Sequence, residues 1–390
     1  MAYKYITYFS NWAQYREGSG KFLPDQIDPS LFTHINFAFG MFGFESWSVD
    51  PEEDRSGEER YTGNYKIQPV EWNDEDELYP ALQSLKQKNP NLKTLLSIGG
   101  WSFNTCDDTP ESAGTKYPYG PYTCKLFSKM AADPAGRAEF IKSIIDYCGK
   151  HGFDGIDLDW EYPGDEKRGG QPADYDNYLT LLRDLRQAAG SGFLVTIASS
   201  AVPKGSKKGD EFFRWLAQCG EYLDWFNVMS YDYHGAFDDP QTVGTGANAP
   251  LLIDSEPGGT FYIKRTVDDY LKANIPKEKI VLGLGTYGRT YVVSDFSEGF
   301  GKPFSSAGPA GPATATPGVL SYFEILDKMN SGELDVEKWD EDTLTPYAYS
   351  TTTGLWVTYD NEKSLGYKVS YLIEKELGGA MVWAVDLDKF

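Results

Sequence analysis

Three acidic side chains alternate with apolar ones in one short segment, and that pattern could carry acid–base chemistry. The segment reads Asp-Gly-Ile-Asp-Leu-Asp-Trp-Glu-Tyr-Pro over residues 154–163. In an extended strand successive side chains point to opposite faces, so Asp157, Asp159 and Glu161 would share one face. Aspartate is a poor strand former, so three carboxylates on one strand face need an explanation beyond local propensity.

The surroundings of this segment predict that its acidic face is enclosed. Ile156, Leu158 and Trp160 would form the apolar face, and helix-like runs precede and follow the segment. A sheet in such a strand–helix–strand unit is covered on both sides. Crowded carboxyl groups in a low-dielectric interior raise one another's pKa values, and an acid still protonated near neutral pH is what general acid catalysis needs. We therefore favour catalysis over a solvated acidic edge or a calcium or magnesium site.

The elements that would position this face form a repeating pattern. Strand-like and helix-like runs alternate about eight times, which predicts an α/β fold, a parallel (β/α)8 TIM barrel. The expected strands lie near residues 5–9, 34–39, 93–98, 155–161, 194–199, 225–231, 280–284 and 380–383. The helix-like patterns include residues 76–87, 138–150, 174–188, 211–219, 263–273 and 362–376.

Two long segments interrupt the alternation. Residues 43–73 are polar and helix-poor and predict an extended loop after the second strand. Residues 290–358 combine a Gly/Pro-rich tract with helix-like and strand-like pieces, and a segment of that length should carry its own structure. We predict a small α+β insertion domain at 290–358, after the seventh strand, and a barrel built from 1–289 and 359–390.

Composition narrows the classes of partner and cofactor. The chain has 36 Lys and Arg against 58 Asp and Glu, a formal net charge of −22, which disfavours nucleic acid and membrane partners. A glycine pattern at residues 283–288 precedes a strand-like run instead of the helix that a dinucleotide site requires. No cysteine pair has zinc-ligand spacing. We expect no metal and no cofactor.

The four cysteines divide into two kinds. Cys106 and Cys124 bracket a polar Gly/Pro/Tyr-rich loop and could close it as a disulfide, but the sequence leaves their redox state open. Cys148 and Cys219 lie in helix-like runs and are expected to be buried. No signal-peptide pattern is evident at the start of the chain, which fits a cytosolic protein or a mature secreted one. We expect an extracellular monomer.

Aromatic residues recur where the predicted strands end, which is where barrel enzymes bind their substrates. A single such ring is most often part of the core, but several at one end of a barrel favour a sugar-binding cleft. Apolar ring faces beside polar groups suit a pyranose, which has C–H faces and a rim of hydroxyls. The residues at these ends include Tyr8, Trp12, Phe39, Trp101, Tyr162, Tyr231, Tyr287 and Trp383.

The acidic segment also resembles a known signature. Its pattern Asp-x-x-Asp-x-Asp-x-Glu is similar to that of the family 18 glycoside hydrolases, the chitinases. Segments resembling this family in the same order lie at residues 8–12, 97–101, 229–232 and 378–383. The resemblance spans nearly the whole chain and is strongest to the chitotriosidase-like branch, which has an α+β insertion.

This resemblance implies a retaining hydrolysis in which the 2-acetamido group of the substrate is the nucleophile, an exception to the two-carboxylate scheme. Glu161 would protonate the glycosidic oxygen and later activate water. Asp159 would hold the acetamido N–H while an oxazolinium ion forms, and Asp157 would share a proton with Asp159. Tyr231 would hold the acetamido carbonyl.

The resemblance also implies a set of cleft residues. Phe237 departs from the pattern, because related chitinases often have tryptophan at this position. Cis peptide bonds are implied at Ala38–Phe39, Glu161–Tyr162 and Trp383–Ala384. The residues expected to bind substrate are Tyr8, Trp12, Phe39, Ser97, Trp101, Tyr162, Met229, Asp232, Phe237, Arg289 and Trp383.

The expected function is therefore that of a chitinase acting on chitin or chitooligosaccharides. One alternative is a catalytically weak chitin-binding lectin on the same fold, and such lectins typically lack the last acid of the motif, here Glu161. Another is an endo-N-acetylglucosaminidase that cleaves N-glycan cores or a related enzyme acting on peptidoglycan.

Overall fold

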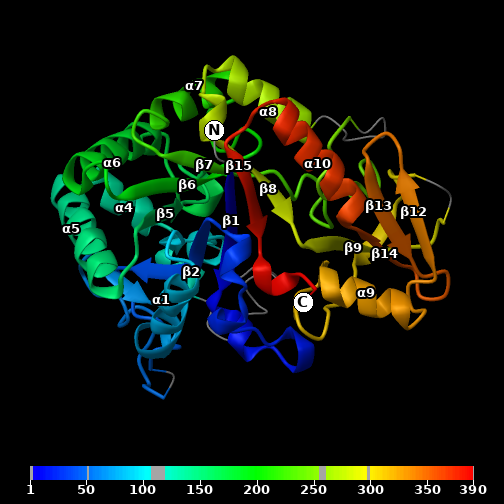
Figure 1. Ribbon diagram of the computed structural model, residues 1–390, viewed down its shortest axis with the longest axis horizontal. Helices are drawn as coiled ribbons and strands as arrows, with labels where there is room; N and C mark the ends of the chain where they lie inside the picture. Colours follow the sequence, from blue (N-terminus) through cyan, green and yellow to red (C-terminus); the bar gives the residue numbers. More distant parts are fainter. Residues whose placement is uncertain (1–2, 51, 107–118, 254–260, 297–298, 390) are drawn as a thin grey trace.

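The computed structural model describes residues 3–50, 52–106, 119–253, 261–296 and 299–389. Within this part of the chain, eight parallel strands close a barrel, because β1 pairs with both β15 and β2. Figure 1 shows β1 and β15, the first and last of these strands along the chain, side by side at its centre. In spatial order they are β1 (Lys4–Ser10), β15 (Gly379–Trp383), β8 (Ile280–Gly285), β7 (Trp225–Met229), β6 (Leu194–Ser200), β5 (Gly155–Asp159), β4 (Lys93–Gly99) and β2 (His34–Phe42). The predicted (β/α)8 barrel is confirmed.

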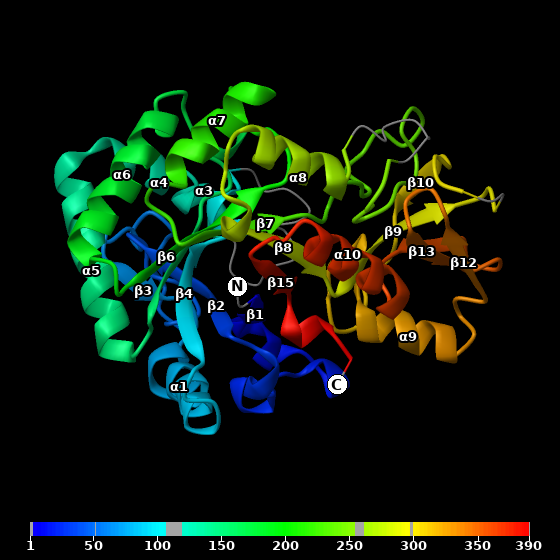
Figure 2. The same cartoon turned by 45° about the horizontal axis from the view of Figure 1, so that its top comes forward.

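Helices cover the outside of this barrel (Figure 2). Their ends follow from local sequence: α5 begins after Asp133, whose side chain accepts hydrogen bonds from the backbone N–H groups of Ala135 and Gly136, and it ends at Gly152 in the left-handed conformation. The described helices are α1 (Tyr79–Lys88), α3 (Gly120–Thr123), α4 (Leu126–Ala132), α5 (Pro134–His151), α6 (Asp174–Ala189), α7 (Asp210–Cys219), α8 (Ile263–Lys272), α9 (Tyr322–Asn330) and α10 (Glu362–Glu374).

The two faces of β5 separate as the alternation predicts. Ile156 and Leu158 are fully buried, and the ring of Trp160 just beyond the strand stacks on Phe127 of α4 at 5.2 Å between centroids. It also meets Tyr178 of α6 edge-on. The apolar face therefore packs against the helices, which leaves the acidic face for the barrel interior.

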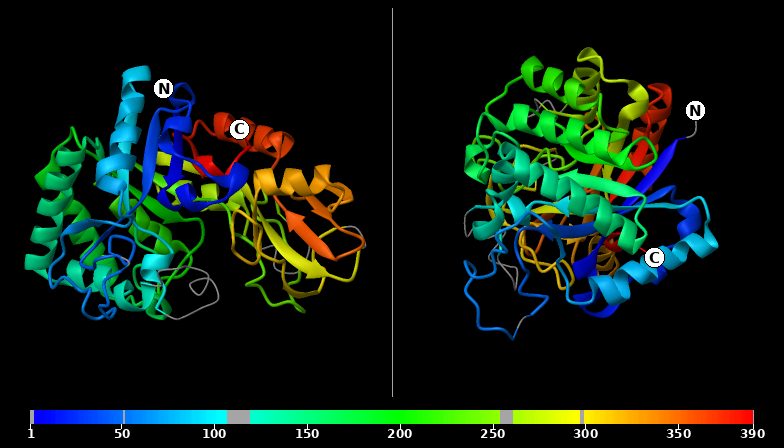
Figure 3. Two further views of the ribbon diagram at one scale, coloured as in Figure 1. Left: turned by 90° about the horizontal axis from the view of Figure 1, so that it is seen from below. Right: turned by 90° about the vertical axis from the view of Figure 1, so that its left-hand side faces the viewer.

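A second sheet lies beside the barrel, as Figure 3 shows from below. It is antiparallel, in the order β10-β9-β14-β13-β12, with β11 also paired to β9. The glycine pattern at 283–288 spans the end of β8 and the start of β9, so a strand stands where a dinucleotide site would need a helix. The proposed domain boundaries at 290 and 358 stay a prediction. The strands are β9 (Tyr287–Val293), β10 (Phe304–Ala307), β11 (Val319–Ser321), β12 (Val336–Asp340), β13 (Thr345–Tyr349) and β14 (Leu355–Thr358).

Several boundaries differ from those predicted. The strands expected to reach residues 161 and 231 end at Asp159 and Met229, so Glu161 and Tyr231 lie in the loops that follow. The backbone N–H of Glu161 donates to the side chain of Asn104 and not to a neighbouring strand. Short 3-10 turns replace the helix of a full β/α unit after β1. The extended loop after β2 includes a short antiparallel strand, β3 (Ile67–Pro69).

The structure decides the pairing that the sequence left open and confirms that Cys148 and Cys219 are buried. Cys106 and Cys124 form a disulfide, and Cys148 and Cys219 are buried free thiols. None of the helices in the described ranges has both the length and the apolar composition needed to cross a membrane.

Candidate active site

Asp157 lies in the barrel interior and is fully saturated with hydrogen bonds. Its Oδ2 atom accepts from the hydroxyls of Tyr8 and Ser97 at 2.7 and 2.8 Å. Its Oδ1 atom accepts from Thr196 Oγ1 at 2.6 Å and from Asn227 Nδ2 at 3.0 Å. These donors come from β1, β4, β6 and β7, so the acid is held from across the barrel. Burial raises the pKa of Asp157, and the hydrogen bonds oppose that rise.

Asp159, two residues further along the same face, is in a different position. The residue is 4% exposed, and its Oδ1 atom has no hydrogen-bond partner among the residues that the structure describes. Burial raises the pKa of Asp159 well above its usual range, and the charges of Glu161 and Asp157 raise it further. A buried acceptor without a donor is costly, so this oxygen is suited to a ligand that brings a donor.

Glu161 stands just beyond the end of β5 and is held there by its backbone. Its N–H donates to Asn104 Oδ1 at 2.8 Å, and its carbonyl oxygen accepts from Arg168 Nε at 2.6 Å. Only 6% of the residue is exposed. The rim of the barrel therefore carries a carboxyl group of fixed position that is nearly excluded from solvent.

The groups around Glu161 act on its pKa in both directions. Burial raises this pKa most, whereas the charge of Arg168 and the hydroxyl of Tyr162 lower it. The charge of Lys204 also lowers it, and that of Asp232 raises it. The net direction is upward, which keeps Glu161 protonated to a higher pH than an exposed glutamate. A carboxyl group in this state can act as a general acid.

Four aromatic rings form a wall next to Asp157. Trp383 lies 5.1 Å from Tyr8 and 5.8 Å from Phe39 between ring centroids. Trp12 stacks near Phe39 at 6.0 Å and is 6.4 Å from Trp383. Since the hydroxyl of Tyr8 also donates to Asp157, this wall adjoins the acidic face. The expected cis peptide bonds are all present, at Ala38–Phe39, Glu161–Tyr162 and Trp383–Ala384.

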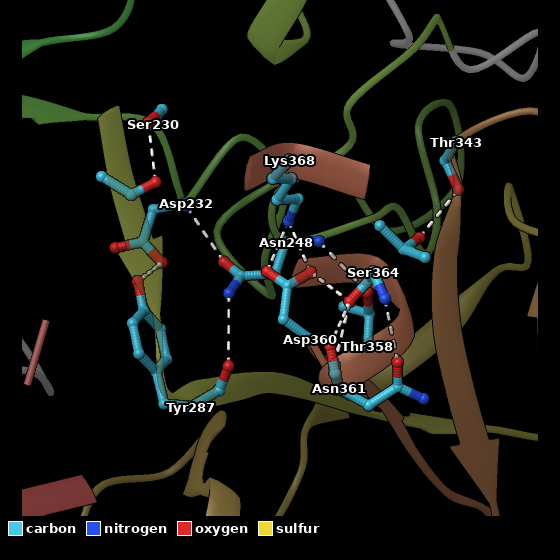
Figure 4. A network of polar contacts seen from close by, with 12 residues as sticks. Ser230, Asp232, Asn248, Tyr287, Thr343, Thr358, Asp360, Asn361, Ser364 and Lys368 are labelled. Carbon is cyan, nitrogen blue, oxygen red and sulfur yellow. Dashed lines mark hydrogen bonds and ion pairs between the residues drawn. The ribbon is translucent and has the colours of Figure 1, made fainter. Parts of the chain in front are cut away.

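A third group of side chains lies just after the end of β7 and at the start of β9 (Figure 4). Asp232 has a positive φ of 57°, and its Oδ1 atom accepts from Tyr287 Oη and Arg289 Nε, each at 2.7 Å. Asn248 fixes the backbone here: its Oδ1 atom accepts from the N–H of Asp232, and its Nδ2 atom donates to the carbonyl of Tyr287. The ring of Tyr231 is buried and meets Tyr287 edge-on at 6.0 Å.

Tyr231 is electrostatically close to the acids, because the charge of Asp159 is the main contribution after burial to its raised pKa. The remaining predicted residues lie around these groups. Met229 is half-buried at the end of β7, and Phe237 is 55% exposed with the guanidinium of Arg289 5.5 Å from its ring. Trp101 is 44% exposed and has Arg168 over its ring.

Asp154, the first acid of the motif, does not join this site. It forms ion pairs with Lys86 at 2.7 Å and Lys93 at 2.9 Å and accepts from the N–H of Thr94. The interpretation of Asp154 as a structural residue at the entry to the strand agrees with these contacts.

Sequence reasoning missed several residues that hold the acids. Thr196 and Asn227 are polar residues within apolar strands, and the register that places Thr196 beside Asp157 could have identified the first. Asn104 and Arg168 lie in loops, where no periodic pattern indicates a contact. Within the described ranges, no cluster of three or more His, Cys, Asp or Glu side chains could hold a metal ion.

Comparison with known proteins decides the family. The model of glycosyl hydrolases family 18 matches residues 4–388. The chain belongs to glycosyl hydrolase family 18. Chitotriosidase-1 of Mus musculus is 34% identical over 399 residues, which cover 100% of this chain and 74% of that protein.

Two solved structures show the range of this family. The Group IV chitinase of Ostrinia furnacalis in complex with allosamidin is 31% identical with a TM-score of 0.81, over 100% of this chain and 94% of that one. Human YKL-39 is described as a pseudo-chitinase with retained chitooligosaccharide-binding properties. It is 31% identical with a TM-score of 0.78, over 99% of this chain and 93% of that one.

Proposed function

We propose that this family 18 protein is a chitinase that hydrolyses β-1,4 bonds between N-acetylglucosamine units with retention of configuration. The observation that carries the proposal is the state of Asp159. This buried carboxyl group has a raised pKa and an Oδ1 atom without a donor, between the saturated Asp157 and the rim acid Glu161. An acetamido N–H of the substrate would supply the missing donor.

The proposed reaction uses the substrate as its own nucleophile. Glu161, whose pKa is raised by burial, donates its proton to the glycosidic oxygen as the bond to the anomeric carbon breaks. The acetamido carbonyl oxygen attacks the anomeric carbon and gives an oxazolinium ion, while Asp159 accepts the hydrogen bond of the acetamido N–H. The carboxylate of Glu161 then takes a proton from a water molecule as the water oxygen bonds to the anomeric carbon. The bond between this carbon and the acetamido oxygen breaks, so the acetamido group re-forms, and the two successive displacements retain the configuration.

The neighbouring groups have supporting roles in this proposal. Asp157 is kept in place by Tyr8 and Ser97, and its charge raises the pKa of Asp159. The sharing of a proton between Asp157 and Asp159 would require one of the four donors to Asp157 to move away during the reaction. Tyr231 holds the acetamido carbonyl. The aromatic wall around Trp383 forms the floor beneath the distorted sugar, because the apolar face of a pyranose packs well on a ring. Trp12, Phe39, Trp101, Tyr162, Met229, Asp232, Phe237 and Arg289 would line the cleft on either side.

The experiment that tests this proposal measures the first product anomer released from chitohexaose by NMR. The β-anomer fits retention, and the α-anomer would contradict an oxazolinium route. Glu161→Gln should abolish turnover while chitooligosaccharide binding persists. Glu166→Gln is the matched control, because it makes the same substitution at an exposed side chain in the turn over residues 166–168. Undiminished turnover in Glu161→Gln would remove Glu161 from its role.

A chitin-binding lectin is the second candidate, and the similarity to human YKL-39 is the observation that favours it. Measurable release of sugar excludes it. An endo-N-acetylglucosaminidase of the same fold is separated by assaying chitohexaose beside a high-mannose glycopeptide. We also infer an extracellular location, because the disulfide between Cys106 and Cys124 is typical of oxidising compartments. A monomer stays a prediction.

A further inference from the structure

Arg168 makes contacts that the roles described so far leave unused. It is the last residue of a 3-10 turn, η7 (Glu166–Arg168), in the loop after β5. Its Nε atom donates to the carbonyl oxygen of Glu161 at 2.6 Å, and its Nη2 atom donates to the carbonyl oxygen of Trp101 at 2.7 Å. Its Cζ atom lies 3.5 Å from the centroid of the Trp101 ring. One guanidinium thus binds two loops and stacks on an exposed ring.

The geometry of these contacts requires arginine. A planar guanidinium can donate from two edges and stack through its face at once, whereas a lysine ammonium is a point charge on a flexible chain. A cation this near an aromatic face contributes a favourable electrostatic interaction and restricts the orientation of the ring. The Trp101 side chain is 44% exposed, so it would otherwise have considerable freedom.

The structure behind Arg168 keeps it in place. The Trp101 carbonyl also accepts from Thr105 Oγ1 at 2.8 Å and from the backbone N–H of Asn104 at 3.2 Å, so three donors fix this backbone. Gly169 follows Arg168 with a φ of 78°, and a side chain there would come within 2.7 Å of the Cys124 carbonyl and 3.0 Å of Cys106 Sγ. The loop that carries Arg168 therefore packs directly against the disulfide.

We propose that Arg168 is a positioning residue that ties the backbone of Glu161 to that of Trp101 and fixes the Trp101 ring as a sugar-stacking surface beside the acid. A sugar lying on this ring would then place its linkage at a constant distance from the proton donor. Small errors in such a distance are costly to the rate. This inference rests on the proposed function and assigns Arg168 to its machinery.

The charge of Arg168 gives the proposal a second, independent signature. The groups that face Glu161 are Asp159 and Asp232, which are acidic, and Arg168, Lys204 and the Tyr162 hydroxyl, of which Arg168 lowers the pKa of Glu161 most. The general acid is active in its protonated form, so activity is lost as pH rises through that pKa. Removing the charge of Arg168 raises the pKa and moves the alkaline limb of the rate profile to higher pH.

Three variants separate the effect of the hydrogen bonds and ring contact of Arg168 from the effect of its charge. Arg168→Met removes both, and we expect kcat/KM on chitotetraose to fall about 10- to 100-fold with the alkaline limb at higher pH. Arg168→Lys keeps the charge but loses the planar guanidinium. We therefore expect kcat/KM to fall while the alkaline limb of the rate profile stays at the wild-type pH. Lys167→Met is the control, because it makes the same charge change on an exposed neighbour. The proposal would be overturned if Arg168→Met had the same kcat/KM and the same alkaline limb as Lys167→Met.

A binding cycle tests the link to Trp101 apart from turnover. Chitotetraose affinity is measured by calorimetry for Arg168→Met, Trp101→Ala and the double variant, all in the Glu161→Gln background. If Arg168 acts through Trp101, the double variant binds no more weakly than Trp101→Ala. Thermal unfolding of each variant first establishes that it is folded at the temperature of the titration. Additive losses of affinity among folded variants would then overturn that link.

The two proposals fail in distinguishable ways. If the protein releases no sugar but the Arg168 and Trp101 variants lose affinity non-additively, hydrolysis is rejected and the positioning role of Arg168 is kept. If the protein hydrolyses chitohexaose with retention but Arg168→Met has the same kinetics as Lys167→Met, the hydrolase function is kept and the role of Arg168 is rejected.

Discussion

Two regions of this molecule bury carboxyl groups, and they treat them in opposite ways. Near the start of α10, Asp360 and Lys368 have side chains that are 1% and 0% exposed, and the ammonium binds both carboxylate oxygens (Figure 4). Ser364 donates a further hydrogen bond to Asp360 at 2.6 Å. On β5, Asp159 is also buried but has an oxygen without a donor, and the charges of Glu161 and Asp157 raise its pKa more than that of Arg168 lowers it. Burial is common to both regions, and only the missing partner distinguishes the candidate site.

The difference teaches how to separate structural acids from functional ones. A paired buried charge is compensated within the fold, whereas an unpaired one costs free energy that the rest of the fold must supply. Groups of the second kind cluster at functional sites. Removing an acid from the paired region should therefore cost stability, and removing one from the unpaired region should cost activity. The predictions below test that contrast.

The largest effect is expected in the paired region. Lys368→Met leaves the Asp360 carboxylate buried without its cation, and we expect the free energy of unfolding to fall by about 3–5 kcal/mol. The measurement is urea denaturation at neutral pH. The double variant Asp360→Leu/Lys368→Met should recover most of the loss, because no charge is then left uncompensated. A single variant as stable as the wild type would show that the pair is not what holds this region.

The unpaired region should respond in activity. Asp159→Asn keeps the shape but offers an amide where the substrate N–H needs an acceptor, so we expect kcat on chitohexaose to fall about 100-fold or more. The free energy of unfolding should not fall, because a neutral amide replaces a carboxyl group whose ionisation burial disfavours. A loss of several kcal/mol in stability would place Asp159 with Asp360 among the structural acids.

Asp157 should lie between these extremes. Its two oxygens accept from Tyr8, Ser97, Thr196 and Asn227, so the amide of Asp157→Asn would turn an NH2 group toward two donors. We expect a loss of about 1–3 kcal/mol in the free energy of unfolding. Equilibrium denaturation measures this loss. The double variant Asp157→Asn/Asn227→Asp is a check, because it exchanges the amide and the carboxylate and so restores the hydrogen bond between the two positions. An unchanged stability would contradict the contacts described for Asp157.

The smallest expected effect is a change of slope with pH. A carboxyl group with a raised folded pKa contributes stability below its unfolded pKa, and that contribution is lost as pH rises through the folded pKa. For Asp159 the unfolded value is near 3.8, so wild-type stability should fall above that pH more steeply than that of Asp159→Asn. Thermal unfolding across a pH series gives both slopes. Equal slopes would show that Asp159 ionises in the folded protein as freely as in the unfolded one.

The contrast between the two regions also explains how far sequence reasoning reached. The alternation in residues 154–163 identified the acidic face, and the apolar residues of that segment did turn to the helices through Trp160. The Asp360 pair was missed, although Ser364 and Lys368 are four residues apart on α10 and Asp360 stands just before the N-cap of that helix. Patterns within one element are readable because the geometry of the element is regular.

The sequence by itself determined that strands and helices alternate around a closed barrel and that the acids of one strand share a face. Each of these follows from periodic side-chain directions or from composition along a continuous stretch of chain. Only the tertiary structure decided that Asp157 is saturated while Asp159 lacks a donor, and that Arg168 joins Glu161 to Trp101. Those facts depend on side chains from separate strands and loops meeting at one point, and no local rule specifies which donors reach which acceptor.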